Sequence, residues 1–361
     1  MNEVLIFYGS QKEYIKRIPV DHTNLTELVM QLDENKMKVE IQGQPKTEEK
    51  KLHVVNLIVE SSEYAGVREH VILNFANFLN KFEVDNLYLQ NPPMQISDQM
   101  KRLFPAKIEY QQYRTIDEKT IKQINKDFDT KIFGQCEAKD FILRVLYPMV
   151  LSDRTKPAVL LLYGKSGVGK TETANYIAEV LGEPLFRKQF SMFQNNQFST
   201  YLFGGAHYEK SFAKDLLDRE SNIILLDEFD KANPVFHSAF YQLFDEGKYE
   251  DQNYYVKLEK SIIVCTSNYT DEAQIKKELG DAIFNRFDAI IKFADLDSEA
   301  KIKIATTHFE RIAKLYKDEK DISLPEDIIS KMMKAVLKAQ NSREIQHFIS
   351  DTFSMYSIQN L

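Results

Sequence analysis

The chain has 361 residues, of which 43% are hydrophobic and 28% are charged, and its net charge is −7. This length allows two domains with cores of their own, and the acidic balance argues against a protein that wraps nucleic acid. No apolar run approaches the roughly 20 residues of a membrane span, and the first residues carry no export signal. We therefore expect a soluble cytoplasmic protein with no membrane partner.

Residues 1–115 are predicted to form a small N-terminal recognition domain of α/β or α+β class. Apolar runs at 4–8, 52–59 and 86–89 are typical of strands, and residues 67–82 have helical periodicity. The polar stretch 42–51 predicts a loop. This part contains no motif with a recognisable chemistry.

Three further segments follow in chain order. Residues 116–130 are polar with helical periodicity and are predicted to be a linker helix that joins separately folding domains. Residues 131–295 contain alternating apolar strands and helices and are predicted to form a nucleotide-binding core. Helical patterns at 298–316, 325–338 and 342–357 predict a small lid over residues 296–361.

The apolar strand predicted at 160–163 runs directly into the pattern G-x-x-x-x-G-K-T and then into a helix. Glycines in this pattern let backbone N–H groups turn around a phosphate, while Lys170 neutralises the β and γ oxygens and the Thr171 hydroxyl ligates Mg²⁺. The predicted nucleotide-binding residues here are Gly164, Lys165, Ser166, Gly167, Val168, Gly169, Lys170, Thr171 and Glu172.

A second apolar run at 221–226 ends in Asp227 and Glu228. It predicts a buried parallel strand that places both acids at its carboxyl end, the edge where ligands bind in an open α/β sheet. Asp227 is predicted to hold Mg²⁺, and Glu228 to polarise the attacking water. Together the two motifs predict an ATPase with ATP and Mg²⁺ as ligands.

The order of these motifs resembles that of AAA+ ATPases, specifically the Clp-type unfoldase and disaggregase clade, over residues 131–350. The resemblance rests on Phe133-Gly134-Gln135, on the continuation of the acidic strand through residues 225–234, and on residues 242–247. It implies an α/β P-loop core with a helical lid, and it implies that Ile132 and Phe133 contact adenine.

The resemblance assigns three more site residues. The apolar strand at 262–267 is similar to the sensor-1 strand, which implies that Asn268 orients the attacking water. Residues 283–288 resemble an arginine-finger segment, so Arg286 would act on the nucleotide of a neighbouring subunit. Arg343 opens a helix and resembles sensor 2, which would couple the lid to the γ-phosphate.

The chain also departs from the clade. The region 201–210, where Clp-type rings carry an aromatic loop that grips polypeptide, is shortened, although Tyr208 or Phe203 could substitute. The segment 268–284 is too short for the loop by which some relatives dock a barrel peptidase, so no such peptidase partner is expected.

The resemblance implies a homo-oligomer, such as a hexameric ring or spiral, that remodels or unfolds a protein target chosen by the N-terminal domain. A second hypothesis is an ATP-controlled assembly switch or scaffold that recruits a partner without threading it. A nucleic-acid motor or loader is a weaker third hypothesis because the net charge is negative.

Overall fold

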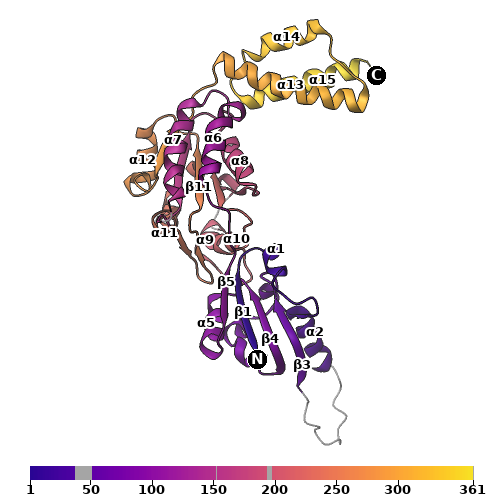
Figure 1. Cartoon of the computed structure of the whole chain (residues 1–361), viewed down its shortest axis with the longest axis vertical. Helices are drawn as coiled ribbons and strands as arrows, with labels where there is room; N and C mark the ends of the chain where they lie inside the picture. Colours follow the sequence, from indigo (N-terminus) through magenta and orange to yellow (C-terminus); the bar gives the residue numbers. More distant parts are fainter. Residues whose placement is uncertain (37–50, 152, 193–196, 361) are drawn as a thin grey trace, which may run out of the picture. The chain divides into compact units, whose positions relative to one another are not determined.

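The computed structural model describes residues 1–36, 51–151, 153–192 and 197–360. The chain divides into two compact units. The first contains residues 1–113, 194–220 and 246–258, and the second contains residues 114–193, 221–245 and 259–361. Each unit is built on a five-stranded parallel sheet, drawn as arrows in Figure 1.

The sheet of the first unit has the strand order β2-β3-β4-β1-β5. All of its pairs are parallel, so every strand ends at the same edge. Apolar side chains pack on both faces, as expected for a parallel sheet covered on two sides. This result decides between the two predicted classes in favour of α/β. Its strands are β1 (Glu3–Tyr8), β2 (Thr23–Asn24), β3 (Leu52–Val59), β4 (Phe82–Gln90) and β5 (Lys107–Tyr110).

Short helices connect these strands. The predicted helix at 67–82 is instead two helices, because Asn74 leaves the helical backbone region (φ −131°, ψ 43°) and Phe82 already starts β4. Residues 42–50 of the predicted loop lie outside the described residues. The helices are α1 (Gln11–Ile15), α2 (Leu25–Lys36), α3 (Glu69–Leu73), α4 (Phe75–Leu79) and α5 (Met94–Leu103).

The sheet of the second unit has the order β12-β6-β11-β8-β7, again entirely parallel. The strand that leads into the glycine-rich loop, β6, therefore lies between two neighbours and is buried along its whole length. The strands are β6 (Ala158–Tyr163), β7 (Phe186–Gln189), β8 (Ile223–Asp227), β11 (Ile262–Ser267) and β12 (Ala289–Lys292).

Helices surround this sheet, and three more form the predicted lid. The lid helices share a core that includes Ile345, Ile349 and Phe353, and Figure 1 shows them in orange and yellow. The helices of the unit are α6 (Glu118–Lys131), α7 (Cys136–Leu146), α8 (Lys170–Leu181), α11 (Tyr241–Glu246), α12 (Glu272–Phe284), α13 (Ser298–Lys320), α14 (Glu326–Val336) and α15 (Ser342–Gln359).

The helix predicted at 116–130 is present, but it does not act as a linker between domains. Helix α6 begins at the N-cap Asp117, whose side chain accepts a hydrogen bond from the Thr120 N–H. Ile124 and Phe128 on α6 are fully buried in the same core as β6 and α8. The helix is thus part of the nucleotide-binding unit.

The predicted linear division of the chain also needs correction. The passage at 113/114 matches the expected boundary near 115, but residues 194–220 and 246–258 belong to the first unit. They contain α9 (Gln197–Phe203), α10 (Phe212–Leu217) and the antiparallel pair β9 (Lys248–Glu250) and β10 (Tyr255–Lys257).

Hydrogen bonds join these two segments to the N-terminal residues. The Met94 N–H donates to the Asn253 carbonyl at 2.8 Å, and Nε2 of the buried His207 lies 2.8 Å from the Val67 carbonyl. A single cut therefore cannot separate the units, because the chain passes between them again at 193/194, 220/221, 245/246 and 258/259. No helix among the described residues is long and apolar enough to cross a membrane.

A chain that begins at Arg114 is expected to lose stability rather than fold as an independent ATPase module. Its segments 194–220 and 246–258 would lack the residues that they pack against, and unpaired buried polar groups are costly. We expect the thermal unfolding midpoint of the shortened chain to be lower than that of the whole chain. We also expect a protease to cleave the shortened chain at new sites between residues 197 and 258. Unchanged cleavage and an unchanged midpoint would contradict the division into units.

Candidate nucleotide site

The loop after β6 has the backbone of a phosphate cradle. Gly164, Gly167 and Gly169 have φ values of 137°, 76° and 108°, which other residues rarely adopt. At Gly164 a Cβ atom would also lie 2.5 Å from the Phe293 carbonyl oxygen. Helix α8 starts immediately afterwards, at Lys170. The predicted order of strand, loop and helix is therefore confirmed.

Lys170 places a buried ammonium group inside this loop. Its Nζ donates to the carbonyls of Gly164 and Lys165 at 2.6 and 2.7 Å, and to Oδ1 of Asn268 at 3.3 Å. Burial lowers the pKa of Lys170 to about 8, although Asp230 and Asp227 act in the opposite direction. A bound polyphosphate would supply the anion that a buried cation requires, so the loop fits a nucleotide.

Asp227 ends β8 beside the first turn of α8. Its Oδ1 lies 3.4 Å from the Thr171 hydroxyl and 2.5 Å from the Thr266 hydroxyl, while Oδ2 accepts from Arg187 at 2.5 Å. One hydroxyl and one carboxylate fit Mg²⁺, which takes few protein ligands and completes its shell with phosphate and water. The described residues contain no cluster of three or more His, Cys, Asp or Glu that could hold a metal ion by itself.

Glu228 has a left-handed backbone, with φ 55° and ψ 46°. Its N–H donates to the Thr266 hydroxyl at 3.0 Å, and its carboxylate accepts from Gln189 Nε2 at 3.0 Å. Hydrogen bonds from Ser191 and then Gln189 hold the pKa of Glu228 below its usual value. Such backbone strain in a non-glycine residue is common at active sites.

Parallel register brings these groups to one edge. Strand β11 pairs with β6 on one side, where Ser267 lies opposite Tyr163, and with β8 on the other, where Cys265 lies opposite Leu226. Asn268 therefore follows β11 at the level where the glycine-rich loop follows β6. The structure thus brings Lys170, Asn268, Asp227 and Glu228 together, as the motifs predict.

The lid reaches the loop through the first turn of α15. Asn341 caps this helix, the Ser342 N–H donates to the Gly167 carbonyl at 3.0 Å, and Arg343 donates to the Ser166 hydroxyl at 3.3 Å. Arg343 thus lies at the phosphate loop, as its resemblance to sensor 2 implies. Its role toward a γ-phosphate stays a prediction.

A cavity of about 350 Å³ opens beside the loop. Ile132 and Phe133 line it, together with Val168, Gly169 and Glu172 and residues from the lid. Gln135 holds this region together, since its side chain bonds the backbone of Val168 and Ala294. Ile132 and Phe133 thus lie beside the phosphate loop, and their contact with adenine stays a prediction.

Arg286 follows α12. None of the contacts described for its side chain is with a residue of the phosphate site. Its Nε lies 2.8 Å from Oδ2 of Asp245, its Nη1 donates to the Ala282 carbonyl at 2.5 Å, and its guanidinium lies 4.3 Å from the centre of the Tyr241 ring. This arrangement leaves Arg286 outside the phosphate site of its own chain.

Sequence reasoning missed four side chains that orient the acids, namely Arg187, Gln189, Ser191 and Thr266. The sequence signal that could have found them is the polar residues at the end of β7 and near the end of the apolar strand β11. Both strands lie beside β8, which carries the acids. Only the strand order shows that they face Asp227 and Glu228.

Comparison with known proteins agrees with this geometry. Residues 155–340, just over half of the chain, match the profile of the AAA domain (Cdc48 subfamily). This chain belongs to the AAA family. Two proteins described as ATP-dependent Clp protease ATP-binding subunit ClpL, from Staphylococcus aureus strains bovine RF122 / ET3-1 and MRSA252, are each 30% identical to it over 230 residues. These residues cover 57% of this chain and 32% of each relative.

The chain therefore spans about a third of the length of these relatives, and its ATPase part is similar to theirs. Solved structures share the fold. The S. cerevisiae Hsp104-ADP complex has a TM-score of 0.53 at 18% identity, covering 67% of this chain and 49% of that chain. A closed-state Hsp104 with ATPγS and FITC casein has a TM-score of 0.54 at 13% identity, covering 97% and 86%.

Replacing Thr266 by Val should slow ATP hydrolysis by about 10–100-fold while changing nucleotide affinity much less. The substitution removes the hydroxyl that binds both Asp227 and the Glu228 N–H but keeps the shape of the side chain. Steady-state turnover and nucleotide titration measure the two effects. Thr266→Ser is the matched control and should retain most activity. Equal loss in both variants would show that the hydroxyl is not responsible.

Proposed function

We propose that this chain hydrolyses ATP within a homo-oligomer and uses the cycle to remodel a protein target. The observation that carries the proposal is the meeting of Lys170, the two acids Asp227 and Glu228, and Asn268 at one sheet edge. Phosphoryl transfer needs positioning and charge stabilisation at such an edge more than it needs covalent chemistry.

Each residue has a distinct part in the proposed reaction. Lys170 binds the β- and γ-phosphates, and Thr171 and Asp227 would hold Mg²⁺, which neutralises charge on the phosphate oxygens when bound. Glu228 accepts a proton from the attacking water, and Asn268 orients that water. Gln189 and Ser191 bind the Glu228 carboxylate and orient it, and the carboxylate keeps acceptor positions for a water molecule.

Arg286 supports an oligomer with shared sites. Its described contacts are Asp245, Ala282 and Tyr241, none of which binds phosphate. An arginine that stays outside its own site can complete the site of a neighbour, where it stabilises charge in the transition state. The Clp-type resemblance supports a ring or spiral of six subunits.

A protein target is supported by the relatives. One Hsp104 structure that shares this fold contains FITC casein, a polypeptide. The N-terminal part of the chain lacks a catalytic motif, and we propose that it selects the target. Tyr208 and Phe203, the candidates for gripping polypeptide, are 62% and 44% exposed.

A second candidate is an ATP-controlled switch or scaffold that threads nothing. It is favoured by the position of residues 197–220, which belong to the first unit and bond its N-terminal residues through His207 and Asp218. Turnover measured with an unfolded protein, with DNA and with neither discriminates the candidates. Stimulation by protein supports remodelling, no stimulation supports the switch, and stimulation by DNA would overturn both.

Lys170→Ala is expected to abolish ATP binding, whereas Glu228→Gln should keep binding and stop turnover. The first change removes the cation from the phosphate loop, and the second removes only the group that activates water. Titration with a fluorescent ATP analogue and phosphate release measure the two steps. Equal affinity in the wild type and in Lys170→Ala would refute the assignment of the site.

Arg286→Ala should leave ATP binding intact and reduce hydrolysis by about 10³-fold. Lys277→Ala, which removes an exposed cation from α12, is the matched control and should turn over normally. Mixing Arg286→Ala with Glu228→Gln subunits should restore part of the activity, since one mixed interface has both functional groups. A fully active monomer would argue against shared sites.

A further inference from the structure

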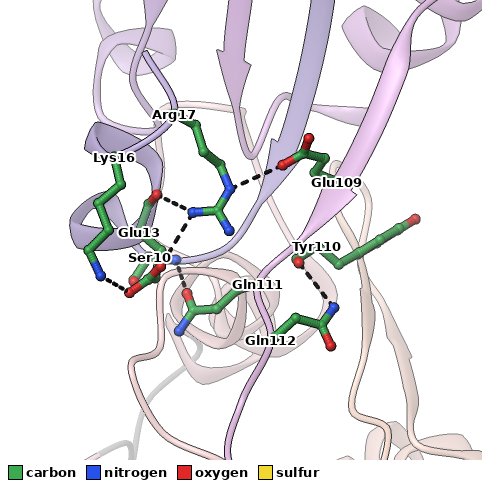
Figure 2. Close-up of polar contacts among 8 residues, drawn as sticks. All are labelled: Ser10, Glu13, Lys16, Arg17, Glu109, Tyr110, Gln111 and Gln112. Atoms are coloured by element: carbon green, nitrogen blue, oxygen red, sulfur yellow. Dashed lines mark hydrogen bonds and ion pairs between the residues drawn. The ribbon is translucent and has the colours of Figure 1, made fainter.

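Side-chain amides close the carboxyl edge of the N-terminal sheet. The Asn91 amide bonds both the N–H and the carbonyl of Gly9, at 2.8 and 2.9 Å. The Gln90 amide donates to the same carbonyl at 3.0 Å and accepts from the Ser61 N–H at 3.1 Å. Gln111 accepts from the Ser10 N–H at 2.7 Å, as Figure 2 shows. These amides fix the ends of β1, β3, β4 and β5 relative to one another.

This edge receives a carboxylate from residues 194–220. Asp218 caps the carboxyl end of α10, and its Oδ1 accepts from Asn91 Nδ2 at 2.6 Å and from Gln90 Nε2 at 3.5 Å. Its Oδ2 accepts from the Ser61 hydroxyl at 3.2 Å. All three donors are buried, with exposed fractions of 0%, 1% and 5%. Hydrogen bonds to a carboxylate are stronger than those between neutral groups.

Three other titratable groups interact with Asp218. Lys214 and Asp215 lie on its own helix, and Tyr254, between β9 and β10, also interacts with it. Burial raises the pKa of Asp218 to about 6, while the Asn91 bond and Lys214 lower it. The neutral donors of the sheet edge are the hydrogen-bond partners described for this carboxylate.

We propose that the carboxyl edge of the N-terminal sheet is a carboxylate-binding site and that Asp218 of the same chain is its ligand. Ligands of open α/β sheets bind at this edge. Here the ligand is covalently part of the segment between the phosphate loop and the acidic strand. The N-terminal sheet thus holds the carboxyl end of α10 through Asp218. This inference does not depend on the proposed ATPase cycle.

Hydrogen exchange of the whole chain without nucleotide tests the proposal. In Asp218→Ala the Gly9 and Ser61 amides, which bond the Asn91 and Gln90 side chains, should exchange about tenfold faster or more, as expected from losing bonds to a charged group. Glu220→Ala is the matched control. It removes a carboxylate from the same segment, but its 3.5 Å pair with Lys12 is exposed, so protection should not change. Equal exchange in both variants would overturn the proposal.

Swapping the carboxylate and the amide between positions 218 and 91 gives an independent test. It stays informative even if one of the single variants is partly unfolded. Asn91→Asp puts a second carboxylate against Asp218 and should raise exchange at both amides at pH 7.5. Acidification to pH 5 should restore part of the protection, because one proton then bridges the pair. The double variant Asn91→Asp, Asp218→Asn should restore part of the protection at pH 7.5, because the bond between positions 91 and 218 re-forms while the bond from residue 91 to the Gly9 carbonyl stays lost. If the double variant exchanges as fast as Asn91→Asp alone, Asp218 is not the ligand.

Discussion

Parallel strands end at a common edge, and this constraint underlies both halves of the molecule. Side chains that follow neighbouring strands meet there although they lie far apart in the sequence. In the second unit the edge collects Lys170, Asp227 and Asn268 around the phosphate loop. In the first unit it collects Gln90 and Asn91 around the carboxylate of Asp218. One geometric rule therefore builds a nucleotide site and, in our proposal, an internal docking site.

The nucleotide site is a connected network rather than a set of independent ligands. Thr266 bonds Asp227 and the Glu228 backbone, and Gln189 bonds the Glu228 carboxylate. A buried cation at Lys170 needs an anion, and the strained backbone at Glu228 needs its neighbours to hold it. In our proposal a bound nucleotide supplies the anion, and the strands beside β8 hold the backbone of Glu228.

Much of the nucleotide unit was predictable because its signals are local. The glycine-rich loop, the apolar strand ending in Asp227 and the periodicity of the lid each occupy a short stretch of sequence, and all three predictions are confirmed. Ile132 and Phe133 line the cavity beside the loop, and their contact with adenine stays a prediction. The N-terminal region was harder, since runs of apolar residues do not reveal whether strands pair in parallel.

The sequence by itself determined the ATPase class, the order of strand, glycine-rich loop and helix, and the strand that ends in Asp227, because these depend on residue types at short spacings. Tertiary structure alone decided that residues 194–220 and 246–258 belong with the N-terminal sheet, and that α6 is core rather than linker. It also decided which polar side chains hold Glu228. The physical reason is the same in each case: contacts between distant residues follow from strand order and register, which no local pattern contains.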